Sequence, residues 1–77
     1  PEIQARLLDL MGRVYQNLGR YDAAWPLVER AWQVRRESLG EDAAPTLESL
    51  THLGELASLQ GRYDVAEAHL RDALARH

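Results

Sequence analysis

The residues whose types and spacing could do chemistry lie in one short stretch, where Glu48, His52 and Glu55 follow one another at intervals of four and three residues. On an α-helix this spacing places the three side chains on one face. Two carboxylates and an imidazole could hold a divalent metal ion such as zinc. The stretch contains a single histidine, however, and no second cluster supports it. We therefore predict a polar surface with ordinary hydrogen bonds, without a metal and without a cofactor.

The other candidates for catalysis stand alone in the sequence. Ser38, Ser49 and Ser58 lie in no nucleophile motif, and no glycine-rich phosphate loop is present. His69 and His77 have no chemical partner near them in the sequence, so we expect both on the surface. The chain has no cysteine, which excludes thiolate chemistry and disulfides and fits a reducing compartment. We predict a cytoplasmic protein that is not an enzyme.

Length and charge exclude further classes of function. The 77 residues allow one small domain. The net charge of −3 comes from interspersed acids and bases, so no basic patch is available for nucleic acid. No apolar run approaches the roughly 20 residues that span a bilayer, so we expect no membrane partner. Because the chain begins with proline instead of methionine, we expect a fragment of a longer protein or a processed piece.

Apolar residues at intervals of three and four predict four amphipathic helices. These helices are expected at about residues 2–18, 22–38, 45–60 and 64–75. Gly19, Gly40 and Gly61 are expected to end the first three helices. Asp22 is expected to cap the second helix, and Pro26 then forfeits only one backbone hydrogen bond near the helix start. We therefore predict that the second helix is intact.

The sequence repeats itself with a period of 42 residues. Residues 19–24 read GRYDAA and residues 61–66 read GRYDVA. Gly12 falls inside the first helix, and Gly54 occupies the same position in the third. A glycine inside a helix costs roughly 0.5–1 kcal/mol relative to alanine, so we attribute both glycines to the close approach of another helix. In register, Leu8, Met11, Gly12, Tyr15, Gly19, Tyr21, Ala24, Val28 and Ala31 correspond to Leu50, Leu53, Gly54, Ala57, Gly61, Tyr63, Ala66, Leu70 and Ala73.

This pattern resembles the tetratricopeptide repeat, whose usual length is about 34 residues. The longer period resembles the 42-residue variety found in kinesin light chains and in many bacterial signalling proteins. The resemblance implies an all-α fold, a right-handed α-solenoid of two helix-turn-helix repeats with four antiparallel helices. It implies a single unit over residues 1–77, with repeat one at about 1–42 and repeat two at about 43–77. In that family small residues make the contacts between helices, and here they would be Gly12, Ala24, Ala31, Gly54, Ala66 and Ala73.

The resemblance implies a non-catalytic scaffold for a protein or peptide partner, because such solenoids hold peptides on their concave surface. The concave strip is predicted to consist of Asp9, Arg13, Gln16, Asn17, Glu48, Thr51, His52, Glu55 and Ser58. The alternative is a solvated polar face. Relatives that bind a peptide carboxylate use Lys and Asn on the first helices, whereas the corresponding face of this chain shows Asp9, Arg13, Glu48, Thr51 and His52. The carboxylate-binding activity is therefore not carried over.

A second functional hypothesis is a regulatory or self-association segment of a larger signalling protein, such as a bacterial kinase or NTPase with a repeat tail. It depends on the two ends of the array, which are not obviously capped by polar residues. The apolar residues at these ends are Ile3, Leu7 and Leu10 on the first helix and Leu70 and Leu74 on the fourth. We expect the chain either to belong to a longer array or to associate with itself through these open ends.

Two further pairs of residues on the second helix carry expectations. Trp25 and Trp32 are seven residues apart and share a helix face. We expect them to pack between the repeats, and the alternative is that one of them is exposed and meets a partner. Arg35 and Arg36 are expected to be solvated near the end of the helix, where positive charge is favoured.

Overall fold

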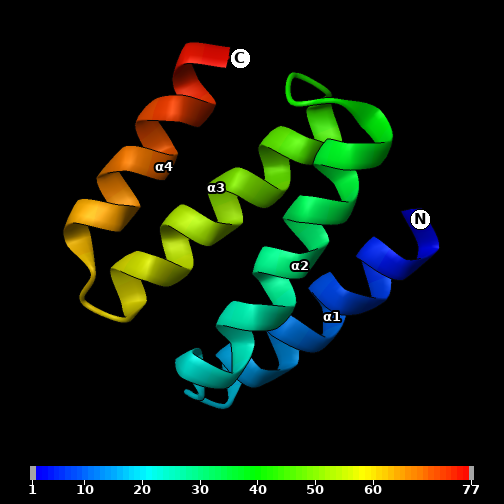
Figure 1. Cartoon of the computed structure of the whole chain (residues 1–77). Helices are drawn as coiled ribbons and strands as arrows, with labels where there is room; N and C mark the ends of the chain where they lie inside the picture. Colours follow the sequence, from blue (N-terminus) through cyan, green and yellow to red (C-terminus); the bar gives the residue numbers. More distant parts are fainter. Residues whose placement is uncertain (1, 77) are drawn as a thin grey trace.

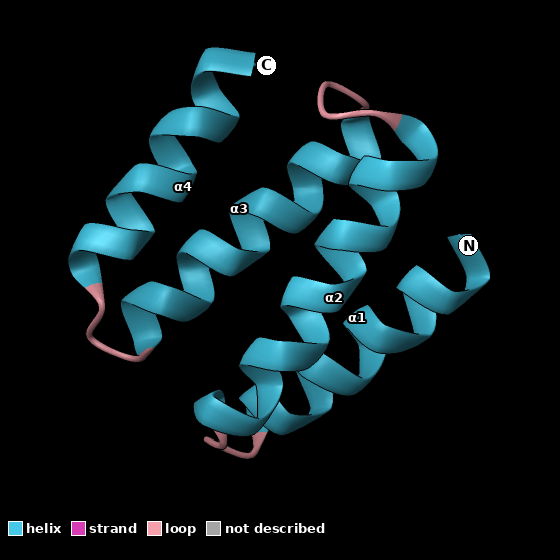
Figure 2. Cartoon of the chain, viewed as in Figure 1, coloured by secondary structure: helices cyan, strands magenta, loops and turns pink. Residues whose placement is uncertain are grey.

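The computed structural model describes residues 2–76 and contains four helices there. They are α1 (Glu2–Asn17), α2 (Tyr21–Leu39), α3 (Ala44–Leu59) and α4 (Tyr63–Arg76). No strand occurs among these residues, and only short loops join the helices (Figure 2). The all-α prediction is confirmed, and the observed helix limits agree with the predicted ones to within one residue.

Each helix packs against the next one along the chain, so that α2 lies against α1, α3 against α2 and α4 against α3 (Figure 1). The first hairpin consists of α1 and α2, and the second of α3 and α4. This serial packing is that of a helical hairpin array, as the repeat in the sequence predicted.

The two hairpin turns have the same backbone hydrogen bonds. The amide of Arg20 donates to the carbonyl of Tyr15 at 2.8 Å, and the amide of Arg62 donates to the carbonyl of Ala57 at the same distance. The glycine before each arginine has a positive φ, which is 76° at Gly19 and 79° at Gly61. This arrangement is a Schellman motif, in which a left-handed residue lets two amides satisfy the last carbonyls of the helix. The identical GRYD segments therefore form identical turns.

Replacing Gly61 with alanine is expected to lower the free energy of unfolding by about 1–2 kcal/mol, since a Cβ atom is costly in the left-handed conformation. No atom lies within 4 Å of the position that this Cβ would occupy, so the cost comes from the backbone alone. Urea denaturation followed by circular dichroism measures it. The matched variant Gly19→Ala is expected to lose a similar amount, and a neutral result at both positions would contradict the turn geometry.

The start of α2 differs from the prediction. The helix begins at Tyr21, its cap position is Arg20, and no side chain caps it. The prediction that Asp22 is the cap is therefore wrong, because Asp22 already lies in the first turn and its carboxylate accepts a hydrogen bond from the Gln60 amide at 2.8 Å. Pro26 lies inside α2, which continues past it to Leu39, so the prediction of an intact helix is confirmed.

The interior glycines are explained by close packing within each hairpin. A Cβ atom added to Gly12 would lie 2.6 Å from Cγ2 of Val28, and one added to Gly54 would lie 2.7 Å from Cγ of Leu70. Neither distance leaves room for a methyl group. The six small residues that were expected at helix contacts are all buried: Gly12, Ala24, Ala31, Gly54, Ala66 and Ala73. The prediction that small residues bring the helices together is confirmed.

A core between the two hairpins is formed by α2 and α3. Leu53 and Leu56 of α3 are buried against Ala24 and Val28 of α2. The side chains of Trp25 and Trp32 pack against this cluster and are half-buried. The expectation that the tryptophans pack between the hairpins is thus confirmed.

The end of α2 corrects the expectation for its two arginines. The Arg35 side chain is buried, with 7% of its surface exposed, and its guanidinium donates to Ser49 Oγ at 2.8 Å and to Glu2 Oε1 at 3.3 Å. Arg36 is half-buried, with its guanidinium 4.5 Å from the centre of the Trp32 ring. Neither arginine is simply solvated. Arg35 instead links α1, α2 and α3, because its two partners lie on α1 and α3.

One of the two isolated histidines also departs from expectation. His69 of α4 is half-buried, and its ring centre lies 6.3 Å from that of Trp25. It contributes to the contact between the hairpins and is not a free surface residue. His77 lies outside the described residues.

Candidate functional site

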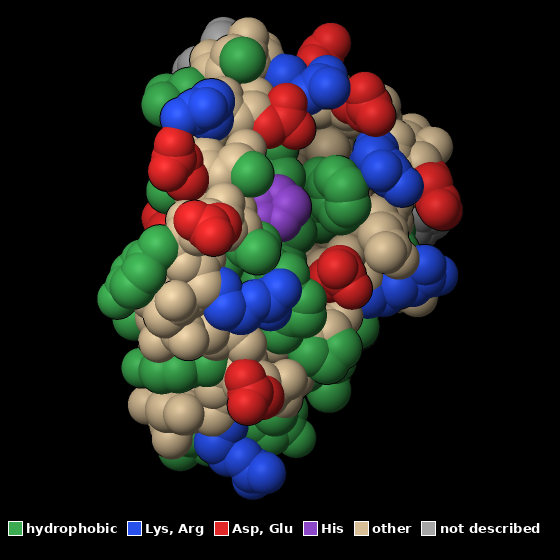
Figure 3. Space-filling view, turned by 60° about the vertical axis from the view of Figure 1, so that its left-hand side comes forward, with side chains coloured by type: hydrophobic (Ala, Val, Ile, Leu, Met, Phe, Trp, Pro, Cys, Tyr) green, Lys and Arg blue, Asp and Glu red, His purple; other side chains and the backbone are tan. Residues whose placement is uncertain are grey.

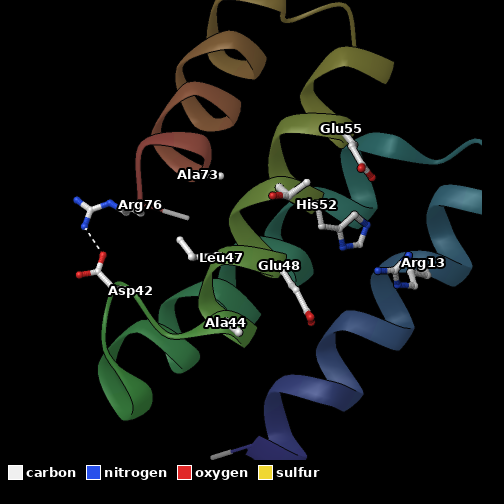
Figure 4. Close-up of a pocket in the computed structure, with 10 residues that line it drawn as sticks. Arg13, Asp42, Ala44, Leu47, Glu48, His52, Glu55, Ala73 and Arg76 are labelled. Carbon is white, nitrogen blue, oxygen red and sulfur yellow. Dashed lines mark hydrogen bonds and ion pairs between the residues drawn. The ribbon is translucent and has the colours of Figure 1, made fainter.

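A groove of about 500 Å³ opens between α1, α3 and α4. It is lined by Arg13, Asp42, Ala44, Leu47, Glu48, Thr51, His52, Glu55, Ala73 and Arg76. Helix α3 forms its floor, because most of the lining residues belong to that helix. Figure 4 shows Glu48, His52 and Glu55 projecting from α3 toward the side where Arg13 lies, with Ala73 and Arg76 of α4 on the opposite side.

The groove brings together part of the predicted concave strip. Five of the nine predicted residues line it: Arg13, Glu48, Thr51, His52 and Glu55. Asp9 and Gln16 do not line it but contact His52. Ser58 borders a separate hollow near Tyr63 and Leu70, and Asn17 is exposed at the end of α1. Four predicted residues therefore lie outside the groove. Asp9 and Gln16 are hydrogen-bond partners of His52, and Asn17 and Ser58 lie nearer the turns.

His52 joins α3 to α1. Its side chain is 3% exposed, its Nδ1 lies 2.8 Å from Oδ1 of Asp9, and its Nε2 lies 2.8 Å from Oε1 of Gln16. A carboxylate can only accept, so Nδ1 donates the proton in the bond to Asp9. Both ring nitrogens are thus engaged with α1, and neither is available to a metal held with Glu48 and Glu55. Among residues 2–76, no group of three acidic, histidine or cysteine side chains is placed to hold a metal ion.

The same contact changes the acidity of Asp9. The hydrogen bond from His52 is the largest cause of a lowered pKa for the Asp9 carboxyl, and burial opposes it. The charges of His52, Arg13 and Arg35 lower this pKa further. A bond to the charged form of a group favours that form, which is the direction seen here.

The lowered pKa of Asp9 predicts that stability falls in acid. Ionised Asp9 contributes stability that is fully present above its unfolded pKa, near 4, and is lost as the pH falls through the lower folded pKa. We expect Asp9→Asn to lose about 1–2 kcal/mol of unfolding free energy near neutral pH and less below about pH 3. Denaturant titrations over this pH range measure the difference. A cost that stayed constant throughout would show that the carboxylate is not involved.

The two cations of the groove are paired with acids. Arg13 Nε lies 3.7 Å from Asp9 Oδ2, and Arg76 binds Asp42 at 3.0 Å and Asp72 at 2.9 Å. The hydrogen bonds that Arg76 donates to Asp42 and Asp72 raise its pKa. Figure 3 shows acidic and basic side chains side by side over one face of the molecule, which is hollowed near its middle.

Two carboxylates of the groove differ from these pairs. Glu48 and Glu55 are exposed, and neither forms an ion pair with another residue in the range 2–76. They lie on the same face of α3, on either side of His52 (Figure 4). The groove therefore presents negative charge that is not neutralised by the described part of the chain.

The sequence did not predict that α4 and the loop before α3 form one side of the groove. Ala73, Arg76 and Asp42 line the groove, and none of them was predicted there. The predicted strip was placed on the first helix of each hairpin only. A signal was available in the acidic residues around Arg76, because Asp72 precedes it by one helical turn.

The serial hairpins and the groove between them define a helical repeat protein of the kind that offers a surface to other molecules. The sequence matches the tetratricopeptide repeat family over residues 3–77, and the chain belongs to this family. Its four helices correspond to two such repeats. No curated protein matches the sequence. Among the helices of residues 2–76, none has the length and apolar character needed to cross a bilayer.

Proposed function

We propose that the chain is a non-catalytic binding module whose groove holds a positively charged segment of a protein or peptide. The observation that carries this proposal is the pair of open carboxylates, Glu48 and Glu55, beside cations that are already paired. Membership of a family of protein-interaction repeats supports it. Opposite charge on the partner would complement the groove and raise the rate of encounter.

The spacing of the two carboxylates suggests the shape of the partner. Glu48 and Glu55 are seven residues apart on a helix, which corresponds to a rise of about 10 Å. A polyproline II segment rises about 9 Å over three residues and returns to the same face. Arg or Lys at positions i and i+3 of such a segment would therefore match both carboxylates. The buried Leu47 and Ala73 also line the groove, on the side of α4, and offer it apolar contacts.

Binding of labelled proline-rich peptides tests the proposal. Fluorescence anisotropy compares a peptide with Arg at i and i+3 with one that carries Glu at these positions. We expect only the Arg peptide to bind, and we expect the double variant Glu48→Gln/Glu55→Gln to weaken its binding about tenfold, which is about 1.4 kcal/mol. The affinity of the unmodified chain is expected to fall with added salt.

A control is Glu37→Gln, which makes the same kind of change once, at an exposed position near the end of α2. It is expected to leave the affinity within about twofold, since the charge lies outside the groove. Equal binding of the Glu peptide, or unchanged binding by the double variant, would remove the groove as the site.

The proposed setting of the module is the cytoplasm, within an array of more than the two repeats described here, which join near residue 42. Further repeats of the same protein or further copies of this chain would complete that array. Three or more repeats are usually needed for a stable stack, which supports a larger assembly. The kinesin-light-chain variety remains the proposed subtype because of the 42-residue period. We do not assign a nucleic acid or a membrane as partner. The alternative role as a regulatory or self-association segment depends on the outer face of α1.

A further inference from the structure

The outer face of α1 is apolar and open. Its exposed apolar side chains, continued by Leu18 directly after the helix, recur at helical intervals: Ile3, Leu7, Leu10, Met11 and Val14. Each of them has between 49% and 75% of its surface exposed. A continuous apolar stripe of this length is uncommon on a monomeric protein and marks an interaction surface.

The 42-residue repeat allows the exposed face of α1 to be compared with the equivalent face of α3. Met11 and Val14 correspond to Leu53 and Leu56 of α3. Met11 is 49% exposed and Val14 is 51% exposed, whereas Leu53 and Leu56 are 1% and 0% exposed. The difference arises because α2 covers α3, and no helix within residues 2–76 covers α1 in the same way. The face of α1 thus has the apolar pattern of a buried helix face, but no helix of residues 2–76 packs on it as α2 packs on α3.

Helix α4 is the repeat equivalent of α2, the helix that covers α3. Four α2 residues that lie in or against the α2–α3 core have equivalents of similar size or apolar character in α4. Tyr21, Ala24, Val28 and Trp32 correspond to Tyr63, Ala66, Leu70 and Leu74. Leu70 packs on Gly54 as Val28 packs on Gly12. The outer side of α4 is open, since Leu74 is 79% exposed and borders a hollow with Tyr63 and Leu70.

We propose that a second copy of this chain covers α1, with its α4 packed there as α2 packs on α3 within the chain. The charges favour this pairing. Where the chain turns after α3, the guanidinium of Arg62 lies 4.5 Å from the centre of the Trp25 ring on α2. The residues equivalent to this pair between copies are Arg20 of one copy and Glu67 of the other, which have opposite charges. Glu67 also pairs with Arg71 on the surface of its own copy, where both side chains are exposed.

The contact is heterologous, because a different surface of each copy takes part. Such head-to-tail contacts leave one α1 face and one α4 face free at the ends, so they lead to open chains of copies. Analytical ultracentrifugation of the 77-residue chain over a range of concentrations up to millimolar is expected to show a mass that rises beyond that of a dimer. A monomer throughout that range would overturn the proposal.

Two single variants separate this arrangement from the other possible occupants. Val14→Glu places a charge on the α1 face and Leu74→Glu places one on the α4 face, both at exposed positions. Each variant alone is expected to be a folded monomer by circular dichroism and ultracentrifugation. Their equimolar mixture is expected to form a one-to-one dimer that does not grow, because only the intact α4 of the first can meet the intact α1 of the second.

The other outcomes overturn the proposal. A dimer of Leu74→Glu alone would show that α1 pairs with α1, and a mixture that stays monomeric would show that the occupant of α1 is a different helix. The matched control is Ala68→Glu, which adds the same charge to α4 at the position equivalent to the exposed Pro26. It is expected to associate as the unmodified chain does. Glu48 and Glu55 lie on neither face, so peptide binding in the groove is tested independently.

Discussion

The Leu56→Ala variant is expected to lose about 3–4 kcal/mol of unfolding free energy. Leu56 is fully buried between α2 and α3, and deletion of a buried leucine side chain costs 2–5 kcal/mol, roughly, through lost burial and the cavity that remains. The total stability of a domain of this size is only about 5 kcal/mol. The variant is therefore expected to be largely unfolded at modest urea concentrations, as measured by circular dichroism.

Val14→Ala provides the matched control, because Val14 holds the equivalent position in the first hairpin. Half of its side chain is exposed, so its loss is expected to cost less than about 1 kcal/mol at concentrations where the chain is monomeric. Similar losses at both positions would mean that α2 does not cover α3 as described. The comparison thus tests the contact between the two hairpins instead of the helices themselves.

The features that could be predicted from the sequence are those determined by neighbours in the chain. The GRYD turns depend on residues within a few positions of Gly19 and Gly61, and the helices depend on their local apolar spacing. The small residues at Gly12 and Gly54 were predicted because the repeat supplied the missing long-range information. Gly12 and Gly54 occupy the same position in the two hairpins, and at both the second helix of the hairpin approaches too closely for a Cβ atom.

The errors concern polar residues whose partners lie far away in the sequence. Arg35 was expected in water, but its guanidinium donates hydrogen bonds to Ser49 and Glu2 inside the structure. Neither partner is repeated 42 residues away, so the period gave no indication of this contact. Asp22 was expected as a cap because its local sequence favours one, but its carboxylate accepts a hydrogen bond from Gln60 of the second hairpin. Both contacts depend on how the helices are placed.

The groove was predicted in part for the same reason. The face of α3 that carries Glu48, His52 and Glu55 follows from helical spacing, and all three residues line the groove. The role of His52 could not be inferred, because its burial depends on the approach of Asp9 and Gln16 from α1. The residue that suggested a metal site in the sequence is instead an internal link between two helices.

The loss of this link is expected to be the second large effect. His52→Ala removes two hydrogen bonds of 2.8 Å and leaves the oxygens of Asp9 and Gln16 without that partner. A lost bond to a charged group costs about 1.5–3 kcal/mol, and the bond to the Gln16 side chain adds about 1 kcal/mol. Because Asp9 is partly exposed and regains some hydration, we expect a loss of about 2–3 kcal/mol in urea denaturation.

A second measurement distinguishes the hydrogen bond from a simple packing defect. The bond from His52 is the largest cause of the lowered pKa of Asp9, so an NMR titration of His52→Ala is expected to show a raised pKa for that carboxyl. Asn17→Ala, at an exposed position one turn from Arg13, is expected to change neither stability nor this pKa. An unchanged Asp9 pKa in the His52 variant would mean that Arg13 and Arg35 hold the carboxylate ionised, and that His52 joins the two helices by packing alone.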